Sequence, residues 1–466
     1  MRFFRKISLF MTGFLMVALL TSCGRADKPP QDGGPPESEN AASADKVSPQ
    51  ITIDVAPISF WFAGGHTSLS VMRGIVNAFN QSQDAYAVSV TAFDDFPELY
   101  RETQAAIATG RAPDVVVLER DASMELYQKG LTVDLTQVLQ QDANFNADRF
   151  LSVYYNQGVS DDGRIFAMPL YGTTQVMYYN KAAFDAAGVS PDSIRTWQDL
   201  ASAAKQIQDT DLYEYGWEPM WGYENMVDAA LSNGGAIYSE DGRTVTINSP
   251  EWAEVWEAYR KWLHEDRIMR IHSGGYGWEY WNYTRNDVME GRAGGYTGSS
   301  GDQADVDFEV VGMLEQPAWD DGQEARPGAR ALLLNVLSMS EPERRDGAYA
   351  LIRYLIDAPA QAAWTIGTGY AAVNQDVVEN ADYQAYLKRN PYAQVPLSQS
   401  AHASVYPYDP TGGLVREAIA RAADRVQIEN LPAQEVLDEA QRTAQKALDA
   451  ALATLPPRGE LEEAEP

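Results

Sequence analysis

The sequence predicts an α/β protein with doubly wound sheets and two domains. Short apolar runs, such as Ile58 to Phe62 and the strand that begins after Pro113, alternate with amphipathic segments at helical spacing. This alternation of strands and helices is typical of doubly wound sheets, which bind ligands at the carboxyl ends of their strands. The body of the chain, residues 51–456, is too long for one hydrophobic core to serve, so we expect two domains.

The N-terminus reads as an export signal. Three basic residues precede an apolar stretch from Ile7 to about Leu20, which is shorter than the ~20 residues of a membrane-spanning helix. The tetrad Leu20-Thr21-Ser22-Cys23 contains the only cysteine of the chain and resembles a bacterial lipoprotein box, in which Cys23 carries the lipid. We therefore expect residues 1–22 to be a lipoprotein signal peptide. The alternative is an ordinary signal peptide followed by an incidental cysteine.

The segments that flank the body have compositions typical of solvated chain. Residues 23–50 are rich in Pro, Gly, Ser, Asp and Ala and contain almost no large apolar residue, so they cannot bury enough surface to fold. We expect this segment to be a disordered tether that holds the folded body off a membrane surface. Residues 457–466 are predicted to be a solvated tail.

Composition and motifs exclude several function classes. The net charge of −30 disfavours nucleic acid as a partner. The four histidines stand apart and have no cysteine partner, so we expect no metal site. The glycine-rich segment 291–302 lacks the patterns of phosphate-binding and dinucleotide-binding loops, and no GxSxG motif occurs, so we expect no cofactor and no catalysis. A binding protein fits these absences better than an enzyme, and 11 Trp and 25 Tyr would suit stacking on sugars.

Several motifs carry a resemblance to a known family. The segments FWFAGG, TGRAPDVVVLE, MYYNKAAFDAAGV, TWQDL and TGYAAVN occur in this order within residues 55–455. Together they resemble the extracellular solute-binding proteins of ABC importers, the family that takes up sugars. Within that family the likeness is greater to the members that bind glycerol-3-phosphate than to the maltose-type binders.

The resemblance implies a type II periplasmic-binding-protein fold, with two lobes that meet at a hinge. Each lobe would be a sheet flanked by helices, with the ligand cleft between the lobes. We expect lobe 1 to comprise residues 51–165 and 312–360, and lobe 2 residues 166–311 and 361–456.

The function implied is capture of a carbohydrate or a glycerol-3-phosphate-like polyol by lobe closure, followed by delivery to an ABC permease. The protein would be a monomer, anchored by its N-terminal lipid at the periplasmic or outer face of a membrane. Two alternatives stay open. One is an exported, lipid-anchored glycan hydrolase, and the other is a sensory binding protein that works without a permease.

The family's ligand positions fall on residues of several types in this chain. Each also has a structural interpretation, as a surface acid, a core ring or a helix-surface arginine. The resemblance implies a ligand-binding carboxylate at the end of a strand, Glu119, and an arginine that contacts phosphate, Arg416. It implies hydroxyls beside glycines at Thr173, Ser299 and Ser300, and aromatic contacts at Trp217, Trp221 and Tyr370.

Two positions depart from the family pattern. Phe96 stands where relatives carry a ring with a hydroxyl, so it cannot donate a hydrogen bond there, although Asp95 is adjacent. Arg330 stands where a small residue normally lets the backbone approach the ligand. It is expected either to bind an anionic ligand as a second positive group or to fill part of the pocket.

Overall fold

The structure is a computed structural model that describes residues 55–275 and 279–454. The predicted signal peptide, Cys23, the tether and the tail lie outside these residues. None of the helices in the described part is both long and apolar enough to cross a bilayer.

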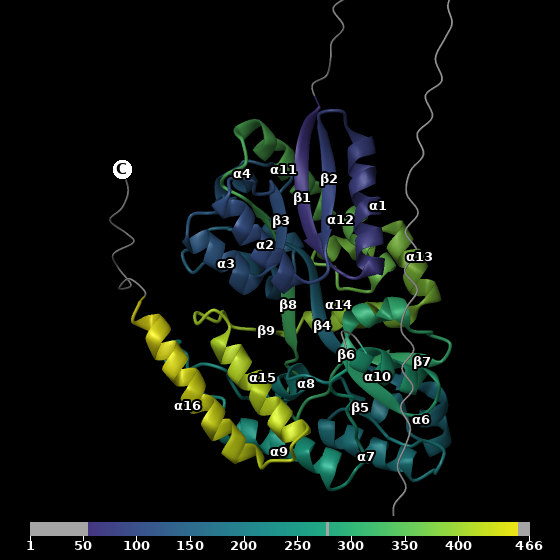
Figure 1. The fold of residues 1–466 in the computed structure, drawn as a ribbon. Helices are drawn as coiled ribbons and strands as arrows, with labels where there is room; N and C mark the ends of the chain where they lie inside the picture. The colour runs from purple at the N-terminus through teal and green to yellow at the C-terminus, as the bar shows by residue number, and fades with distance from the viewer. Residues whose placement is uncertain (1–54, 276–278, 455–466) are drawn as a thin grey trace, which may run out of the picture. The chain divides into compact units, whose positions relative to one another are not determined.

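A mixed sheet runs through the described residues, in the order β2-β1-β3-β8-β4-β6-β5 (Figure 1). The strands β1, β2 and β3 are parallel, whereas β8 pairs antiparallel with β3 and with β4. β7 pairs with β4, and β9 pairs with β8. The strands are β1 (Ala56–Ala63), β2 (Tyr86–Phe93), β3 (Val115–Glu119), β4 (Met168–Asn180), β5 (Glu218–Pro219), β6 (Gly295–Ser299), β7 (Val311–Leu314), β8 (Gly328–Val336) and β9 (Ser404–Val405).

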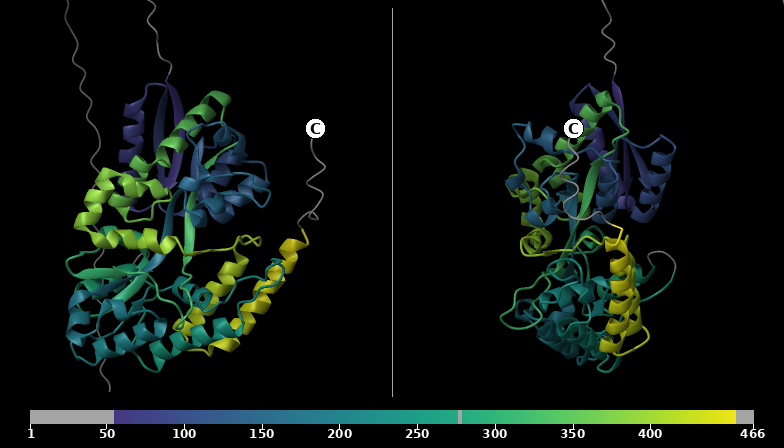
Figure 2. Two further views of the ribbon diagram at one scale, coloured as in Figure 1. Left: turned by 180° about the vertical axis from the view of Figure 1, so that it is seen from behind. Right: turned by 90° about the vertical axis from the view of Figure 1, so that its left-hand side faces the viewer.

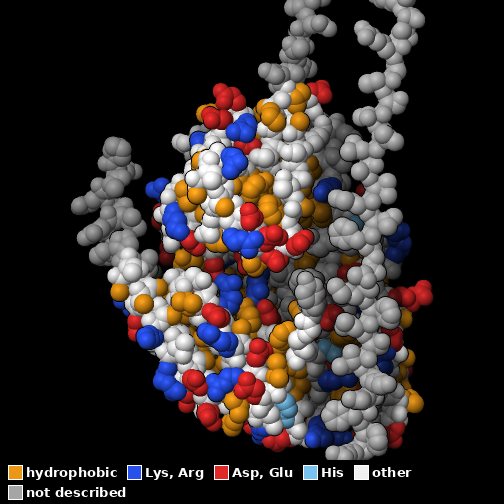
Figure 3. All heavy atoms as spheres, in the orientation of Figure 1, with side chains coloured by type: hydrophobic (Ala, Val, Ile, Leu, Met, Phe, Trp, Pro, Cys, Tyr) orange, Lys and Arg blue, Asp and Glu red, His pale blue; other side chains and the backbone are white. Residues whose placement is uncertain are grey.

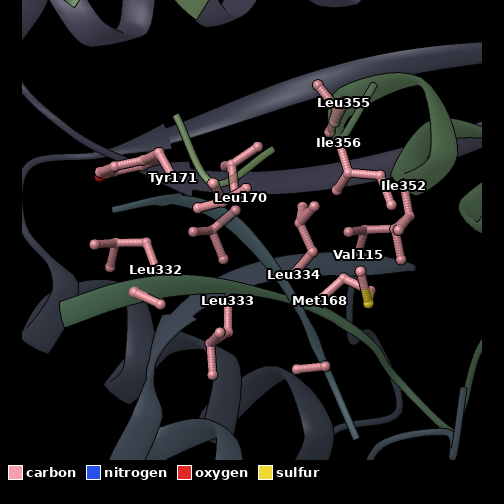
Figure 4. Packing of buried hydrophobic residues seen from close by; sticks show 14 of the residues in the cluster. Val115, Met168, Leu170, Tyr171, Leu332, Leu333, Leu334, Ile352, Leu355 and Ile356 are labelled. Atoms are coloured by element: carbon pink, nitrogen blue, oxygen red, sulfur yellow. The ribbon is translucent and has the colours of Figure 1, made fainter. Parts of the chain in front are cut away.

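A first hydrophobic core surrounds the N-terminal strands and the middle of β8. β3 reads as a continuous apolar run because both of its faces are buried, with Val115 and Val117 in this core and Val116 and Leu118 in a smaller cluster on the other face. Figure 4 shows Leu170, Leu332 and their neighbours packing in the first core. The helices that contribute to these two clusters are α1 (His66–Ser82), α2 (Phe96–Ala108), α3 (Arg120–Gln128), α4 (Thr136–Gln140), α5 (Ser152–Tyr155), α11 (Pro342–Leu355) and α12 (Ala358–Thr368).

A second hydrophobic core lies against the C-terminal half of β4. Thr196 caps the helix that begins at Trp197, in a capping box with Asp199, as its sequence pattern predicts. The helices of this core are α6 (Lys181–Ala187), α7 (Trp197–Gln208), α8 (Glu224–Ser232), α9 (Pro250–His264), α15 (Leu414–Gln427) and α16 (Ala433–Leu452). The views of Figure 2 show α15 and α16 side by side beneath the strands of the first core. The remaining helices are α10 (Glu279–Met289), α13 (Ala381–Arg389) and α14 (Val395–Ser400).

Three segments join the two cores: the middle of β4, the chain that leads into β8, and the chain between α12 and α15. The lobe boundaries expected from the sequence differ from the cores in three places. Residues 166–171 and 361–373, expected in lobe 2, contribute apolar side chains to the first core. Residues 312–319, expected in lobe 1, include Trp319 of the second core. The differences arise because a segment that passes from one core to the other has no sequence signal at the crossing point.

Candidate ligand-binding site

A cavity of about 270 Å³ lies where residues of the two cores face one another. The first core contributes Tyr171 and Leu332 to its wall, and the second contributes Val227 and Ile419. Figure 3 shows basic and acidic side chains gathered around a hollow on this face of the molecule. The volume lies close to the lower end of the ~300–1,000 Å³ range of small-molecule sites.

The strands bring most of the predicted residues to this cavity. Glu119 is the last residue of β3, Ser299 is the last residue of β6, and Thr173 on β4 pairs directly with Arg330 on β8. This placement agrees with the tendency of ligands to bind beyond the carboxyl ends of strands. Six of the residues predicted for the site therefore line one cavity, and they are Glu119, Thr173, Ser299, Arg330, Tyr370 and Arg416.

Arg330 lies beside two tyrosine rings. Its guanidinium carbon lies 4.7 Å from the ring centre of Tyr406 and 5.8 Å from that of Tyr223. Nη2 donates to Tyr223 Oη at 3.0 Å and to Glu224 Oε1 at 3.4 Å. Among the described residues, both of these hydrogen bonds use Nη2, so Nε and Nη1 remain for another partner.

Arg416 is bound to carboxylates of the first core. It forms an ion pair with Asp121 and lies 3.8 Å from Glu119. A third arginine of the cavity wall, Arg120, donates from Nη1 to the backbone oxygen of Tyr406 at 3.0 Å. Three arginines and three carboxylates thus share the cavity wall, the third carboxylate being that of Asp409.

Aromatic rings form the opposite part of the wall. Tyr370 lies 4.8 Å from Tyr171, measured between ring centres, and is stacked on Trp364 behind it. Gly301 leaves room for Tyr370, because a Cβ there would lie 2.4 Å from the tyrosine ring. Burial raises the pKa of Tyr370 and of Tyr223 to about 12, so both phenols keep their protons at neutral pH and can donate hydrogen bonds.

The sequence profile for "Bacterial extracellular solute-binding protein" matches residues 74–391. The chain belongs to this family. Among the relatives of this solute-binding protein is the sn-glycerol-3-phosphate-binding periplasmic protein UgpB of Yersinia pestis, which is 25% identical over an alignment of 428 residues; the match covers 87% of this chain and 92% of the relative. The UgpB of Rhizobium meliloti is 25% identical over an alignment of 361 residues, and the match covers 73% of this chain and 81% of the relative.

Solved structures show the same fold. The structure of UgpB from Mycobacterium tuberculosis, in complex with glycerophosphocholine, matches 85% of this chain and 99% of its own, with a TM-score of 0.74 and 20% identity. The GacH receptor of Streptomyces glaucescens, whose structures include a complex with acarbose, gives a TM-score of 0.73 at 17% identity, over 85% of this chain and 99% of its own. These matches confirm the mixed α/β periplasmic-binding-protein fold that the sequence predicts.

Three predicted residues do not reach the cavity. Trp217 is fully buried in the second core, where its Nε1 donates to Thr297 Oγ1 at 2.9 Å. Ser300 is also fully buried. Trp221 donates from Nε1 to Asp424 at 2.8 Å and packs edge-on against Tyr280. None of the three lines the cavity as the sequence analysis expected: the second core encloses Trp217, Ser300 is buried, and Asp424 and Tyr280 engage the partly exposed Trp221.

Several cavity residues were missed by the sequence analysis. Arg120 and Asp121 directly follow Glu119, and their position at the end of a predicted strand could have suggested them. Tyr223, Tyr406 and Asp409 had no comparable signal. Of the two residues that the sequence analysis noted at the start of α2, Phe96 lines the cavity. The side chain of Asp95 instead accepts a hydrogen bond from the Glu98 amide and caps the helix.

A second cluster of titratable groups lies apart from the cavity. Glu218, His272 and Asp287 have potential metal-ligand atoms within 4.8 Å of one another. Arg270 Nη2 already lies 2.5 Å from Glu218 Oε1 and also pairs with Asp287. The guanidinium therefore already supplies, next to these carboxylates, the positive charge that a metal ion would bring. Burial still raises the pKa of Glu218 to about 8, against the opposing effect of Arg270.

The buried position of Trp217 gives a prediction about its variant. Trp217→Phe removes the indole N–H that bonds Thr297 and leaves unfilled space in the core, so we expect the free energy of unfolding to fall by about 1–3 kcal/mol. Ligand affinity, measured by calorimetry, should stay within about twofold of wild type, since a loss of less than about 0.4 kcal/mol is expected at a residue outside the cavity.

Tyr370→Leu is the matched control, because Tyr370 lines the cavity and its loss should weaken binding. A tenfold loss of affinity in a well-folded Trp217→Phe protein would contradict this prediction and indicate that Trp217 takes part in ligand binding.

Proposed function

We propose that this protein captures a glycerol-phosphate-like polyol in the cavity and delivers it to an ABC permease. The observation that carries this proposal is Arg330, which faces the cavity from β8 with Nε and Nη1 available and with Arg120 and Arg416 on the same wall. A guanidinium offers paired N–H donors that suit phosphate oxygens. The name of the UgpB relatives supports the same ligand class.

A monosaccharide-sized sugar is the second candidate. The wall formed by Tyr171 and Tyr370 offers ring faces and a hydroxyl, which suit a sugar. A cavity of about 270 Å³ favours one small polyol or one sugar ring over a long oligosaccharide.

We infer that binding closes two lobes around the ligand. The lobes would be centred on the two hydrophobic cores, with residues 55–172 and 328–374 in the first and residues 175–319 and 406–454 in the second. The three segments that join the cores would be the hinge, and a permease could then distinguish the closed form from the open one. We further propose that the protein acts as a monomer.

A thermal-shift screen of residues 51–466 tests the ligand class. The panel contains sn-glycerol 3-phosphate, glycerophosphocholine, inorganic phosphate, glucose and maltose. A ligand that binds only the folded state stabilises it by about 2.7 kcal/mol at a hundredfold excess over its dissociation constant. We expect the glycerol phosphates to raise the midpoint more than the sugars. Recovery of the ligand unchanged, read by NMR, separates binding from hydrolysis.

The Arg330→Gln variant sharpens this test. Losing hydrogen bonds from a charged donor costs about 1.5–3 kcal/mol, so we expect phosphate ligands to bind at least about tenfold more weakly. Arg421→Gln is the control, because Arg421 is an exposed α15 residue that pairs with Glu417 and does not line the cavity. Shifts with neutral sugars alone, undiminished in Arg330→Gln, would replace the phosphate proposal with the sugar one.

We further propose that the protein is anchored through a lipid on Cys23, at the outer face of a membrane. The order of basic residues, apolar stretch and small residues before Cys23 supports this. In cells, Cys23→Ser should move the protein from the membrane fraction to the soluble fraction, as followed by immunoblot. A Cys23→Ser protein that still sediments with membranes at high salt would contradict the anchor.

A further inference from the structure

A buried carboxylate lies directly behind the cavity wall. Asp228 on α8 is 1% exposed, and its neighbour Val227 lines the cavity. Asp228 itself is not part of the wall. A carboxylate is costly to bury unless donors compensate it, so the partners of Asp228 decide what it does.

Asp228 joins three distant segments of the chain. Its Oδ1 accepts from Tyr406 Oη at 2.6 Å and from the Gly328 backbone N–H at 2.9 Å, and its Oδ2 accepts from Gln316 Nε2 at 2.7 Å. Gly328 permits this approach, since a Cβ there would lie 2.7 Å from Asp228 Oδ1 and 1.9 Å from the Tyr406 ring. The carboxylate thus ties a helix of the second core to the first residue of β8.

Two hydrogen-bond partners of Asp228 lie close to Arg330, the residue on which the proposed function rests. Tyr406 lines the cavity, and its ring lies 4.7 Å from the Arg330 guanidinium. Arg330 follows Gly328 by two residues on β8, so the carboxylate holds both the strand and the ring that set the place of the guanidinium. Asp228 and Arg330 also attract one another electrostatically.

We propose that Asp228 is a positioning residue of the ligand site: it fixes Tyr406 and the start of β8 so that Arg330 faces the cavity. This inference rests on the proposed function, in which Arg330 holds the ligand. Asp228 touches no ligand itself and acts through its two neighbours.

A pH dependence of binding follows from this arrangement. Burial raises the pKa of Asp228 to about 6, although hydrogen bonds from Tyr406 and Gln316 oppose the shift. The titratable and charged groups that face Asp228 are Arg330 on β8, Tyr406 after β9 and Tyr259 on α9, with Glu224 one turn away on its own helix. Protonation removes the attraction for Arg330, so affinity falls as the pH drops through about 6.

The effect on stability has the opposite sign. Because the carboxyl pKa is higher in the folded chain than its usual value of 3.8, the folded state binds more protons between pH 3.8 and about 6, and ionisation lowers stability as the pH rises through that window. A neutral Asn at this position avoids that cost, but its amide nitrogen cannot accept, so one of the three donors loses its acceptor. Weaker binding that a control variant of similar stability does not show would therefore identify a positioning role and exclude a merely structural one.

The test compares wild type with Asp228→Asn at pH 7.5, 6.0 and 5.0. The probe is glycerophosphocholine, because a phosphomonoester titrates near pH 6 and would confuse the profile; maltose replaces it if the screen shows binding of sugars only. We expect wild-type affinity to fall at least about fivefold between pH 7.5 and 5.0, the effect of roughly one hydrogen bond. Asp228→Asn should bind about fivefold more weakly at pH 7.5, with a flat profile, and its thermal midpoint should fall about as far as that of Asp114→Asn, which likewise leaves one of three donors without an acceptor.

Two further variants serve as controls. Asp114→Asn alters a buried carboxylate with three hydrogen bonds that lies away from the cavity, so its binding profile should match wild type. Asp302→Asn is needed because burial raises the pKa of Asp302 to about 7, and Asp302 interacts electrostatically with Tyr370. A pH profile that disappears in Asp302→Asn and persists in Asp228→Asn overturns the proposal.

A ligand-free readout separates this proposal from the proposed function. Phenylglyoxal modification of Arg330, followed by mass spectrometry at pH 7.5, reports how firmly the guanidinium is held. We expect a faster reaction in Asp228→Asn than in wild type and in Asp114→Asn. Equal rates overturn the positioning role. Absence of any ligand shift together with a faster reaction would reject the proposed ligand class and leave the positioning role intact.

Discussion

The antiparallel pairing of β4 with β8 is the contact on which the binding site depends. The first half of β4 pairs with β8, and its second half pairs with β6 and β7, so one strand of 13 residues belongs to both cores. The register that sets Thr173 opposite Arg330 also brings both side chains to the cavity. A slip of one residue would turn Arg330 to the opposite face of the sheet, because successive side chains of a strand alternate.

The local sequence predicted helices and strands better than it predicted where the chain passes from one core to the other. The apolar run of β3 and the Thr196 cap of α7 are encoded within a few residues, and both are found in the structure. Trp217 and Tyr370 illustrate the limit, since both are aromatic residues near glycines, and only the packing of distant helices buries one and leaves the other at the cavity. Asp228 had no local signal either, because its three hydrogen-bond donors are 88, 100 and 178 residues away in the chain.

The cavity also shows why net charge is a poor guide to ligand charge. The chain carries a formal charge of −30, yet three arginines line the cavity. Exposed charges are screened over about 8–10 Å in physiological salt, whereas a guanidinium inside a cavity acts at contact distance. In the proposed function, selection for a solute would therefore depend on Arg330 and its neighbours, whereas the acidic surface disfavours polyanions.

The arginines differ in what a ligand must displace. Arg416 is engaged by Asp121 and lies near Glu119, so an anion that bound it would compete with carboxylates that are already in place. Among the described residues, Arg330 bonds only through Nη2, to Tyr223 and to the carboxylate of Glu224, which does not line the cavity, and its guanidinium lies beside the rings of Tyr223 and Tyr406. A guanidinium that is fixed in advance loses less side-chain entropy when a ligand binds than a free one would. The preorganised group is therefore Arg330, and the carboxylate that maintains its place is Asp228, behind the wall and out of reach of the ligand.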